Sequence, residues 1–347
     1  MHSLDFSNIR KILIRSTNWI GDAVMTTPAM GAVRATFPHA EVVVAAPPLV
    51  GELFTPHPYC DRVVALDKNK AEGSLRALLR FSGLLRAEGF DLALLFQNAF
   101  GAALTALLAS IPYRAGYRTD GRGILLTHGV AIGEAQRRLH HTGYYLHMLD
   151  RLGIRGGDGR LALSCTEQEK ARALKLIESD GDRPFLVAIN PGAAYGSAKK
   201  WLPERFAAVA DAIADEFGAR IMLTGGPAEE LLGREIESAM HTRPLNLVGK
   251  TSVRQLMALL SLCSLMITND SGPMHVAAAF SVPVVALFGS TDHTTTSPLS
   301  SSYRIVRKAM PCAPCLKRSC PTDHRCMAAI TVQDVLEAAR SLLLKEG

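Results

Sequence analysis

The sequence predicts an α/β protein made of two Rossmann-like, doubly wound domains that face a central cleft. The chain has 347 residues, of which 48% are hydrophobic, enough to build about two cores. Short apolar strands alternate with amphipathic helices, first in one half and then in the other, as expected for parallel sheets. Glycines and polar residues follow several strands, where such sheets bind ligands.

The first half contains four apolar segments that predict buried strands. A loop at 17–26 separates the first strand from a helix at about 28–37, and a second helix is expected at 74–88. We expect this half to form a domain over 1–170. The strands are predicted at 11–16, 41–47, 62–67 and 92–96.

The second half repeats the alternation after a charged helix at 167–179 and a polar linker at 179–184. We expect a domain over 183–330, followed by a segment at 331–347 whose helix, capped by Thr331, packs across the domains. Helices are predicted at 203–217 and 253–263, and strands at 185–190, 220–225, 245–249, 265–270 and 282–289.

Composition narrows the function. No apolar run is long enough to span a membrane and the first residues do not resemble a signal peptide, so we expect a cytoplasmic protein with reduced cysteines. Part of the net charge of +6 comes from six arginines and four histidines within 114–151. They suit a phosphorylated or acidic partner or an anionic membrane surface, and equally an ordinary solvated face. Aromatic residues are only 6%, which argues against nucleic acid.

The stretch "ITNDSGPMHVAAAF" predicts an anion site at the start of a helix. Gly272 permits close backbone approach and Pro273 suits the first helical turn, so that free N–H groups point outward. Asp270 would repel a phosphate and is expected to hold a sugar hydroxyl or brace the loop. Ser271 lies in the same loop, and His275 either reaches the ligand or packs in the core.

Other loops after strands carry weaker signals, each with a structural alternative. Asp22 is either a general base or a helix N-cap. Lys199, in "NPGAAYGSAKKW", is either a phosphate ligand or an exposed lysine. Glu229 would accept bonds from a ribose or complement a helix dipole, while Thr251 or Ser252 would contact a ligand or cap a helix.

Missing motifs are also informative. No G-x-G-x-x-G follows a strand, which weakens a dehydrogenase hypothesis. The single D-x-D, at Asp180 and Asp182, lies in the expected linker. A diphosphate leaving group would therefore be neutralised by lysine and a helix N-terminus, and we expect no required metal or other cofactor. The closely spaced Cys312, Cys315, Cys320 and Cys326 are one candidate structural zinc site. The alternatives are reduced thiols or a disulfide.

Taken in order, five segments resemble glycosyltransferase family 9, the ADP-heptose:lipopolysaccharide heptosyltransferases. They are "STNWIGDAVMTTPAMGAVRATFP", "NPGAAYGSAKKWLPERF", "LTGGPAEE", "LVGKTS" and "TNDSGPMHVAAAFSVPVVALFGSTD". The "NWIGDAVMTTPA" form is most similar to the members that add the second inner-core heptose. The resemblance runs through nearly the whole chain, although the cysteine-rich segment resembles only a subset of the family.

The resemblance implies a GT-B fold, with an N-terminal acceptor domain and a C-terminal nucleotide-sugar domain. It implies inverting transfer of L-glycero-D-manno-heptose from ADP-heptose to the first heptose of heptosyl-Kdo2-lipid A. Asp22 then matches the catalytic base and Lys199 the family's lysine. The donor residues would be Glu229, Thr251, Asp270, Ser271, Gly272 and His275, and the phosphorylated acceptor would contact Arg118, Arg137 and Arg138.

The expected location is the cytoplasmic face of the inner membrane of a Gram-negative bacterium, with peripheral contact to its anionic lipids. Three alternatives stay open at this point. The acceptor could be that of heptosyltransferase I or of another family 9 transferase, the enzyme could be a nucleotide-sugar epimerase, or the chain could bind a nucleotide sugar without catalysis.

Overall fold

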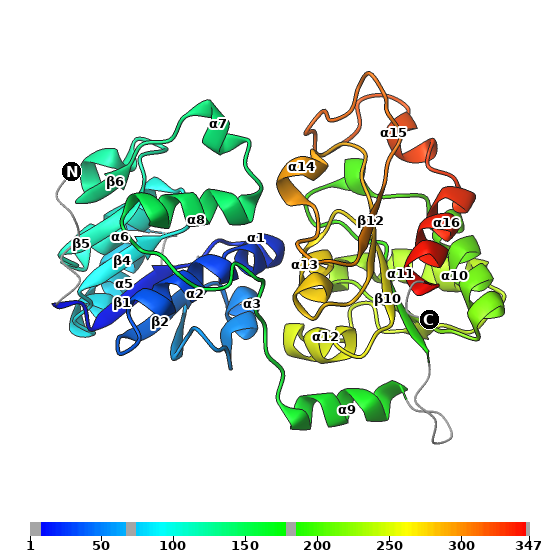
Figure 1. Ribbon diagram of the computed structural model, residues 1–347, viewed down its shortest axis with the longest axis horizontal. Helices are drawn as coiled ribbons and strands as arrows, with labels where there is room; N and C mark the ends of the chain where they lie inside the picture. The colour runs from blue at the N-terminus through cyan, green and yellow to red at the C-terminus, as the bar shows by residue number, and fades with distance from the viewer. Residues whose placement is uncertain (1–7, 67–73, 178–184, 345–347) are drawn as a thin grey trace. The chain divides into compact units, whose positions relative to one another are not determined.

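The computed structural model describes residues 8–66, 74–177 and 185–344. The chain divides into two compact units, Met1–Ser164 and Cys165–Gly347, and each has its own parallel sheet (Figure 1). Among the described residues, no helix is long and apolar enough to cross a membrane.

The first unit contains a six-stranded parallel sheet in the order β3-β2-β1-β4-β5-β6. Its central strands are buried apolar runs, as expected for a sheet covered by helices on both faces. In register, Leu13 of β1 lies between Val43 and Ala93. The strands are β1 (Lys11–Arg15), β2 (Glu41–Ala46), β3 (Arg62–Ala65), β4 (Leu92–Leu95), β5 (Tyr113–Tyr117) and β6 (His128–Val130).

The two helices predicted in the first unit, at 28–37 and 74–88, correspond to α2 and α5, and its other helices were not predicted. The expected loop at 17–26 contains the short helix α1, so the chain enters α2 after a helical turn. Strands β5 and β6 also extend the sheet beyond the four predicted strands. The helices are α1 (Ile20–Met25), α2 (Thr27–Thr36), α3 (Pro48–Gly51), η2 (Glu52–Phe54), α5 (Leu75–Ala87), α6 (Phe100–Leu108), η3 (Arg122–Leu125), α7 (Glu134–Arg137) and α8 (His141–Arg151).

The second unit repeats this architecture with the strand order β12-β11-β10-β7-β8-β9, again all parallel. All five predicted strands are present, and β12 is an additional edge strand that was not predicted from the sequence. The strands are β7 (Leu186–Asn190), β8 (Arg220–Leu223), β9 (Leu245–Asn246), β10 (Leu265–Asn269), β11 (Val284–Leu287) and β12 (Tyr303–Val306).

The helices of the second unit cover both faces of this sheet (Figure 1). On one face, a hydrophobic core joins the strands to the helices at 203–217, 230–239 and 332–343. The helices are α9 (Glu167–Ile177), η4 (Ser197–Lys199), α10 (Pro203–Phe217), η5 (Pro227–Glu229), α11 (Glu230–Ala239), α12 (Val253–Leu260), α13 (Gly272–Ala279), α14 (His293–Thr296), α15 (Arg325–Ala328) and α16 (Val332–Leu343).

The C-terminal helix α16 begins with the predicted cap. The Thr331 side chain accepts a hydrogen bond from Asp334 N, and the Asp334 carboxylate accepts one from Thr331 N at 2.8 Å. The apolar face of α16, with Val335 and Ala339, joins the core of the second unit, where α16 packs on α10 and β12. Its expected packing across the domains stays a prediction.

The division between the units lies between Ser164 and Cys165, earlier than the expected bounds of 170 and 183. The reason is α9, which packs on α12 of the second unit. Arg254 of α12 donates through Nε to Glu169 Oε1 at 2.7 Å, and this ion pair fixes α9 there. The linker expected at 179–184 lies outside the described residues.

Strand order places a topological switch point in each sheet. The crossovers turn in opposite directions between β1 and β4 in the first unit and between β7 and β10 in the second. In doubly wound sheets, ligands bind at the carboxyl ends of the strands beside such a point. The loops after β1, β7 and β10 are therefore the places where chemistry is expected.

We predict that Glu169→Gln makes the second unit less stable and less sensitive to acid. The hydrogen-bonded Arg254 lowers the pKa of Glu169 from 4.5 to about 2. A lowered carboxyl pKa stabilises the fold above the unfolded value, and this stabilisation is lost as the pH falls from about 4.5 to about 2. Urea unfolding between pH 7 and pH 2.5 should show a lower midpoint for the variant at pH 7 and a smaller drop on acidification.

Glu167→Gln is the matched control, because Glu167 lies in the same helical turn and pairs with Lys170 while 89% of its side chain is exposed. Such a pair contributes little to stability. If the two substitutions changed the urea midpoint and its pH dependence equally, the ion pair of Glu169 with Arg254 would not be what holds α9 on the second unit.

Candidate active site

The loop after β7, residues 191–200, is here called the lysine loop. Both of its ends are held by Asn269, the buried last residue of β10. Asn269 Nδ2 donates to Pro191 O at 2.7 Å, and Trp201 N donates to Asn269 Oδ1 at 3.1 Å. One amide side chain therefore fixes the loop across the switch point between β7 and β10.

Within the lysine loop, Lys199 forms an ion pair with Asp270, which follows β10. Lys199 Nζ lies 2.6 Å from Asp270 Oδ2, and only 14% and 6% of the two side chains are exposed. Thr291 Oγ1 donates to the same carboxylate oxygen at 2.7 Å, and Lys199 Nζ lies 5.0 Å from the centroid of the Tyr195 ring. A mostly buried cation needs such partners. These contacts therefore fix the charged amino group of Lys199 in a defined place.

The helix α13 begins at Gly272 with Ser271 as N-cap and Pro273 in the first turn, as predicted. The Ser271 hydroxyl accepts a hydrogen bond from Asn190 Nδ2 at 3.1 Å, which fixes the start of the helix against the end of β7. The N-terminus of α13 begins two residues after Asp270, the partner of Lys199. His275 is 2% exposed, so it is packed within the unit.

Glu229 lies after β8, the strand beside β7. Its Oε2 accepts a hydrogen bond from Gly226 N at 2.9 Å. The carboxylate occupies the space next to Gly192, where an added Cβ would come within 1.9 Å of Oε1, so a larger residue there would displace the Glu229 side chain. Ser252, rather than Thr251, caps α12 by accepting from Gln255 N at 3.2 Å. The structure therefore gathers Lys199, Asp270 and Glu229 at one edge of the sheet.

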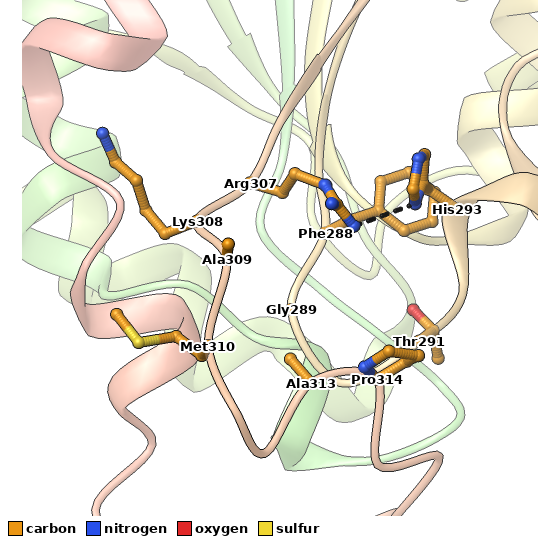
Figure 2. Close-up of a pocket in the computed structure, with 10 residues that line it drawn as sticks. All are labelled: Phe288, Gly289, Thr291, His293, Arg307, Lys308, Ala309, Met310, Ala313 and Pro314. Atoms are coloured by element: carbon orange, nitrogen blue, oxygen red, sulfur yellow. Dashed lines mark hydrogen bonds between the residues drawn. The ribbon is translucent and has the colours of Figure 1, made fainter.

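A cavity of about 100 Å³ adjoins this edge beyond Asp270, between the loops after β11 and β12 (Figure 2). Thr291, the partner of Asp270, lines it. Figure 2 shows Arg307 directed toward His293, with Arg307 Nη1 3.3 Å from His293 Nδ1, whereas Lys308 points away. Lys308 pairs instead with Asp334 at 2.7 Å. The cavity continues the row of loops that contains Asp270.

In the first unit, Asp22 lies after β1, beside the switch point between β1 and β4. It is the third residue of α1, and the N-cap position is held by Trp19, so Asp22 is not the cap. About a third of its side chain is exposed, and His141 Nδ1, at the start of α8, lies 3.4 Å from Asp22 Oδ1. Burial, together with the charge of Asp22, raises the pKa of Tyr145 well above its usual value. Asp22 is thus an accessible carboxylate that rests against α8.

The basic region of 114–151 is not a single charged surface. Arg122 is fully buried, donates to Tyr117 O at 2.8 Å and to Asn98 Oδ1 at 2.7 Å, and has a pKa that burial lowers. Arg114 donates to Leu125 O at 2.8 Å. These two arginines satisfy backbone carbonyls and have structural roles, which corrects the expectation of one solvated or ligand-binding face.

The three arginines predicted to contact the acceptor are exposed. Arg118 follows β5, Arg137 ends α7 and Arg138 is the C-cap of that helix. Within the part of the chain that the structure describes, none of the three forms a salt bridge with a carboxylate. Their charges are available to an anionic partner.

The cysteine-rich segment, residues 312–326, contains four free thiols. Cys312 is exposed, Cys315 and Cys320 are half-buried, and Cys326 is buried. Across the described residues, no group of three or more Cys, His, Asp or Glu side chains is placed to hold a metal ion. The geometry therefore does not support the zinc site suggested by their spacing.

Several residues at these sites were not identified from the sequence. His141 meets Asp22 across 119 positions, Thr291 meets Asp270 across 21, and Asn269 joins the two ends of the lysine loop. No short motif signals such contacts, because they arise from the strand order. The signal available in the sequence was a polar residue in the loop after a strand. Thr291, four residues after the end of β11, is such a residue.

Comparisons with known proteins agree with this architecture. The family model described as glycosyltransferase family 9 (heptosyltransferase) matches residues 78–325. Lipopolysaccharide heptosyltransferase 2 of Salmonella typhimurium is 30% identical, over 97% of this chain and 99% of its own. The structure of Escherichia coli ADP-heptose lps heptosyltransferase II is 29% identical and superposes with a TM-score of 0.79, over 97% of this chain and 99% of that one.

A third protein, the glycosyl transferase family 9 structure from Veillonella parvula, shares 23% identity with a TM-score of 0.85 and 99% coverage of both chains, which supports the fold. The two six-stranded parallel sheets are those of the GT-B heptosyltransferase structures. The family model covers well over half of the chain, and the relatives align along nearly all of it. The chain is thus a glycosyltransferase that belongs to family 9, the heptosyltransferases.

Proposed function

We propose that this protein transfers L-glycero-D-manno-heptose from ADP-heptose to the first heptose of heptosyl-Kdo2-lipid A, with inversion at the anomeric carbon. The observation that carries the proposal is the gathering of Lys199, Asp270 and Glu229 at one sheet edge. A cation and two carboxylates suit the diphosphate and the hydroxyl groups of a nucleoside diphosphate sugar. Similarity along the full length to proteins named lipopolysaccharide heptosyltransferase 2 supports the choice of sugar and acceptor.

The second unit is proposed to bind the donor. Lys199 and the amide groups at the start of α13, including Gly272, neutralise the diphosphate. Glu229 accepts hydrogen bonds from the ribose, and Thr251 contacts the nucleotide. Asp270 and Ser271 complete the site, with Asp270 bound to a sugar hydroxyl while Thr291 holds its carboxylate, and the buried His275 supports α13 from within the unit. With these charges supplied by the protein, we expect transfer to need no metal ion.

Asp22 is proposed to act as the general base. It takes the proton of an acceptor heptose hydroxyl while that oxygen attacks the anomeric carbon of the donor and the bond to the ADP oxygen breaks. ADP leaves with the electron pair, stabilised by Lys199 and the α13 amides. The mechanism requires the first and second units to act on one donor–acceptor pair, and closure on substrate is common among two-domain enzymes of this kind.

The first unit is proposed to bind the acceptor through Arg118, Arg137 and Arg138. Their exposed guanidinium groups lack carboxylate partners among the described residues, and guanidinium pairs well with phosphate. An acceptor anchored in a membrane would bring the protein to the cytoplasmic face of the inner membrane, where anionic lipids attract basic surfaces. The protein is therefore proposed to be cytoplasmic and peripheral.

The acceptor is the part of this proposal with a competing candidate. Escherichia coli lipopolysaccharide heptosyltransferase 3 is 27% identical over 94% of this chain, so the relatives include proteins named for a different step. The relatives named heptosyltransferase 2 are more similar and cover more of the chain, which favours the first heptose as acceptor.

We predict that Asp22→Asn lowers kcat by about 10²–10⁴-fold and leaves the affinity for ADP-heptose nearly unchanged, because the amide cannot accept the proton. Single-turnover kinetics and equilibrium binding of the donor separate the two quantities. Asp120→Asn is the control. It makes the same change at an exposed turn residue with a φ of 51°, which asparagine also adopts. Wild-type turnover by Asp22→Asn would remove Asp22 from the mechanism.

We also predict that Lys199→Ala raises the KM for ADP-heptose and lowers kcat, each by about tenfold or more. The variant loses the cation that faces the diphosphate and leaves the nearly buried Asp270 without its ion-pair partner. Steady-state kinetics with varied donor measure both effects. Lys200→Ala, one residue further along the same loop, should behave like wild type. Unchanged kinetics for Lys199→Ala would exclude Lys199 from donor binding.

A further inference from the structure

The cysteine-rich segment packs directly on the lysine loop. Ala198 N donates to Arg318 O at 3.0 Å, and the Tyr195 hydroxyl donates to Leu316 O at 3.0 Å. His324 Nε2 lies 3.1 Å from Ala198 O, within hydrogen-bond distance. Three contacts thus join one short stretch of the lysine loop to the cysteine-rich segment, immediately before Lys199.

Gly196 allows this close approach. A Cβ at that position would lie 2.1 Å from Arg318 O, so a larger residue would push the segment away. On its other side, Leu316 N donates to Ser290 O at 2.7 Å, next to Thr291. The segment therefore bridges the loops after β7 and β11, the two loops whose side chains hold Asp270.

Two cations share the ring of Tyr195. Lys199 Nζ lies 5.0 Å and Arg318 Cζ lies 5.3 Å from its centroid, within the range of cation–π attraction. Lys199 is paired with Asp270, whereas Arg318 is exposed and forms no salt bridge in the described part of the chain. The charge of Arg318 is therefore available to an anion that binds beside Lys199.

We propose that Arg318 is a donor-binding residue, which supplies a second cation for the diphosphate of the nucleotide sugar. The inference rests on the proposed function, because that function places a diphosphate at Lys199. The guanidinium group offers paired N–H donors that match phosphate oxygens, and it lies 5.3 Å from the centroid of the ring that Lys199 Nζ approaches to 5.0 Å. The cysteine-rich segment then belongs to the active site through its arginine.

The test is calorimetric titration of the whole protein with ADP and, separately, with adenosine. We expect Arg318→Gln to weaken ADP binding about tenfold and to leave adenosine binding unchanged, since adenosine has no phosphate. Arg318→Lys keeps the positive charge and should lose less of the affinity for ADP. The backbone carbonyl of residue 318 still accepts from Ala198 N in both variants, and matching thermal unfolding curves would verify that the segment stays folded.

Lys317→Gln is the matched control, since it removes the same charge from the neighbouring exposed residue. ADP affinity within about twofold of wild type for Arg318→Gln would overturn the inference. An equal loss in Lys317→Gln, or an equal loss of adenosine binding, would overturn it too, by indicating a general charge effect or a structural one. If the wild-type protein fails to bind ADP, the proposed function fails and this inference fails with it.

Discussion

The ion pair between Lys199 and Asp270 is the interaction on which the donor half of this protein depends. It joins the loops after β7 and β10, two neighbouring strands whose connections leave the sheet in opposite directions. Most of both side chains is buried, and burying charges costs free energy unless each has a partner. Thr291 and Tyr195 contact the pair, and Asn269 fixes the loop that carries Lys199. The site is therefore preorganised before a ligand arrives, which is the condition for strong electrostatic stabilisation of a leaving group.

Much of this arrangement could be predicted from the sequence, because it depends on local patterns. Buried apolar runs predicted the central strands, and Gly272 and Pro273 predicted the start of α13. Three strands, β5, β6 and β12, were missed for a physical reason, although the edge strands β3 and β9 were predicted. β5 and β12 are only half-buried over part of their length, and β6 has three residues, so none shows a continuous apolar run.

Long-range contacts could not be predicted in this way. The buried Arg122 donates to the carbonyl of Gln97, 25 residues earlier in the chain. In the same way, α9 joins the second unit because Glu169 pairs with Arg254, 85 residues later. Within the candidate site, the sequence predicted which loops carry polar groups, but not that Thr291 would hold Asp270 or that His141 would lie beside Asp22. The cysteine spacing suggested a metal site, whereas the contacts of the segment lead to the lysine loop.

The proposed reaction adds a heptose to an acceptor that already carries one. The most direct measurement is to incubate the protein with ADP-heptose and either heptosyl-Kdo2-lipid A or Kdo2-lipid A, with and without chelator, while following ADP release and acceptor mass. We expect a gain of one heptose, with matching ADP release, only on the acceptor that carries the first heptose, and no effect of the chelator. A gain on Kdo2-lipid A alone, or no gain on either acceptor, would contradict the proposed reaction.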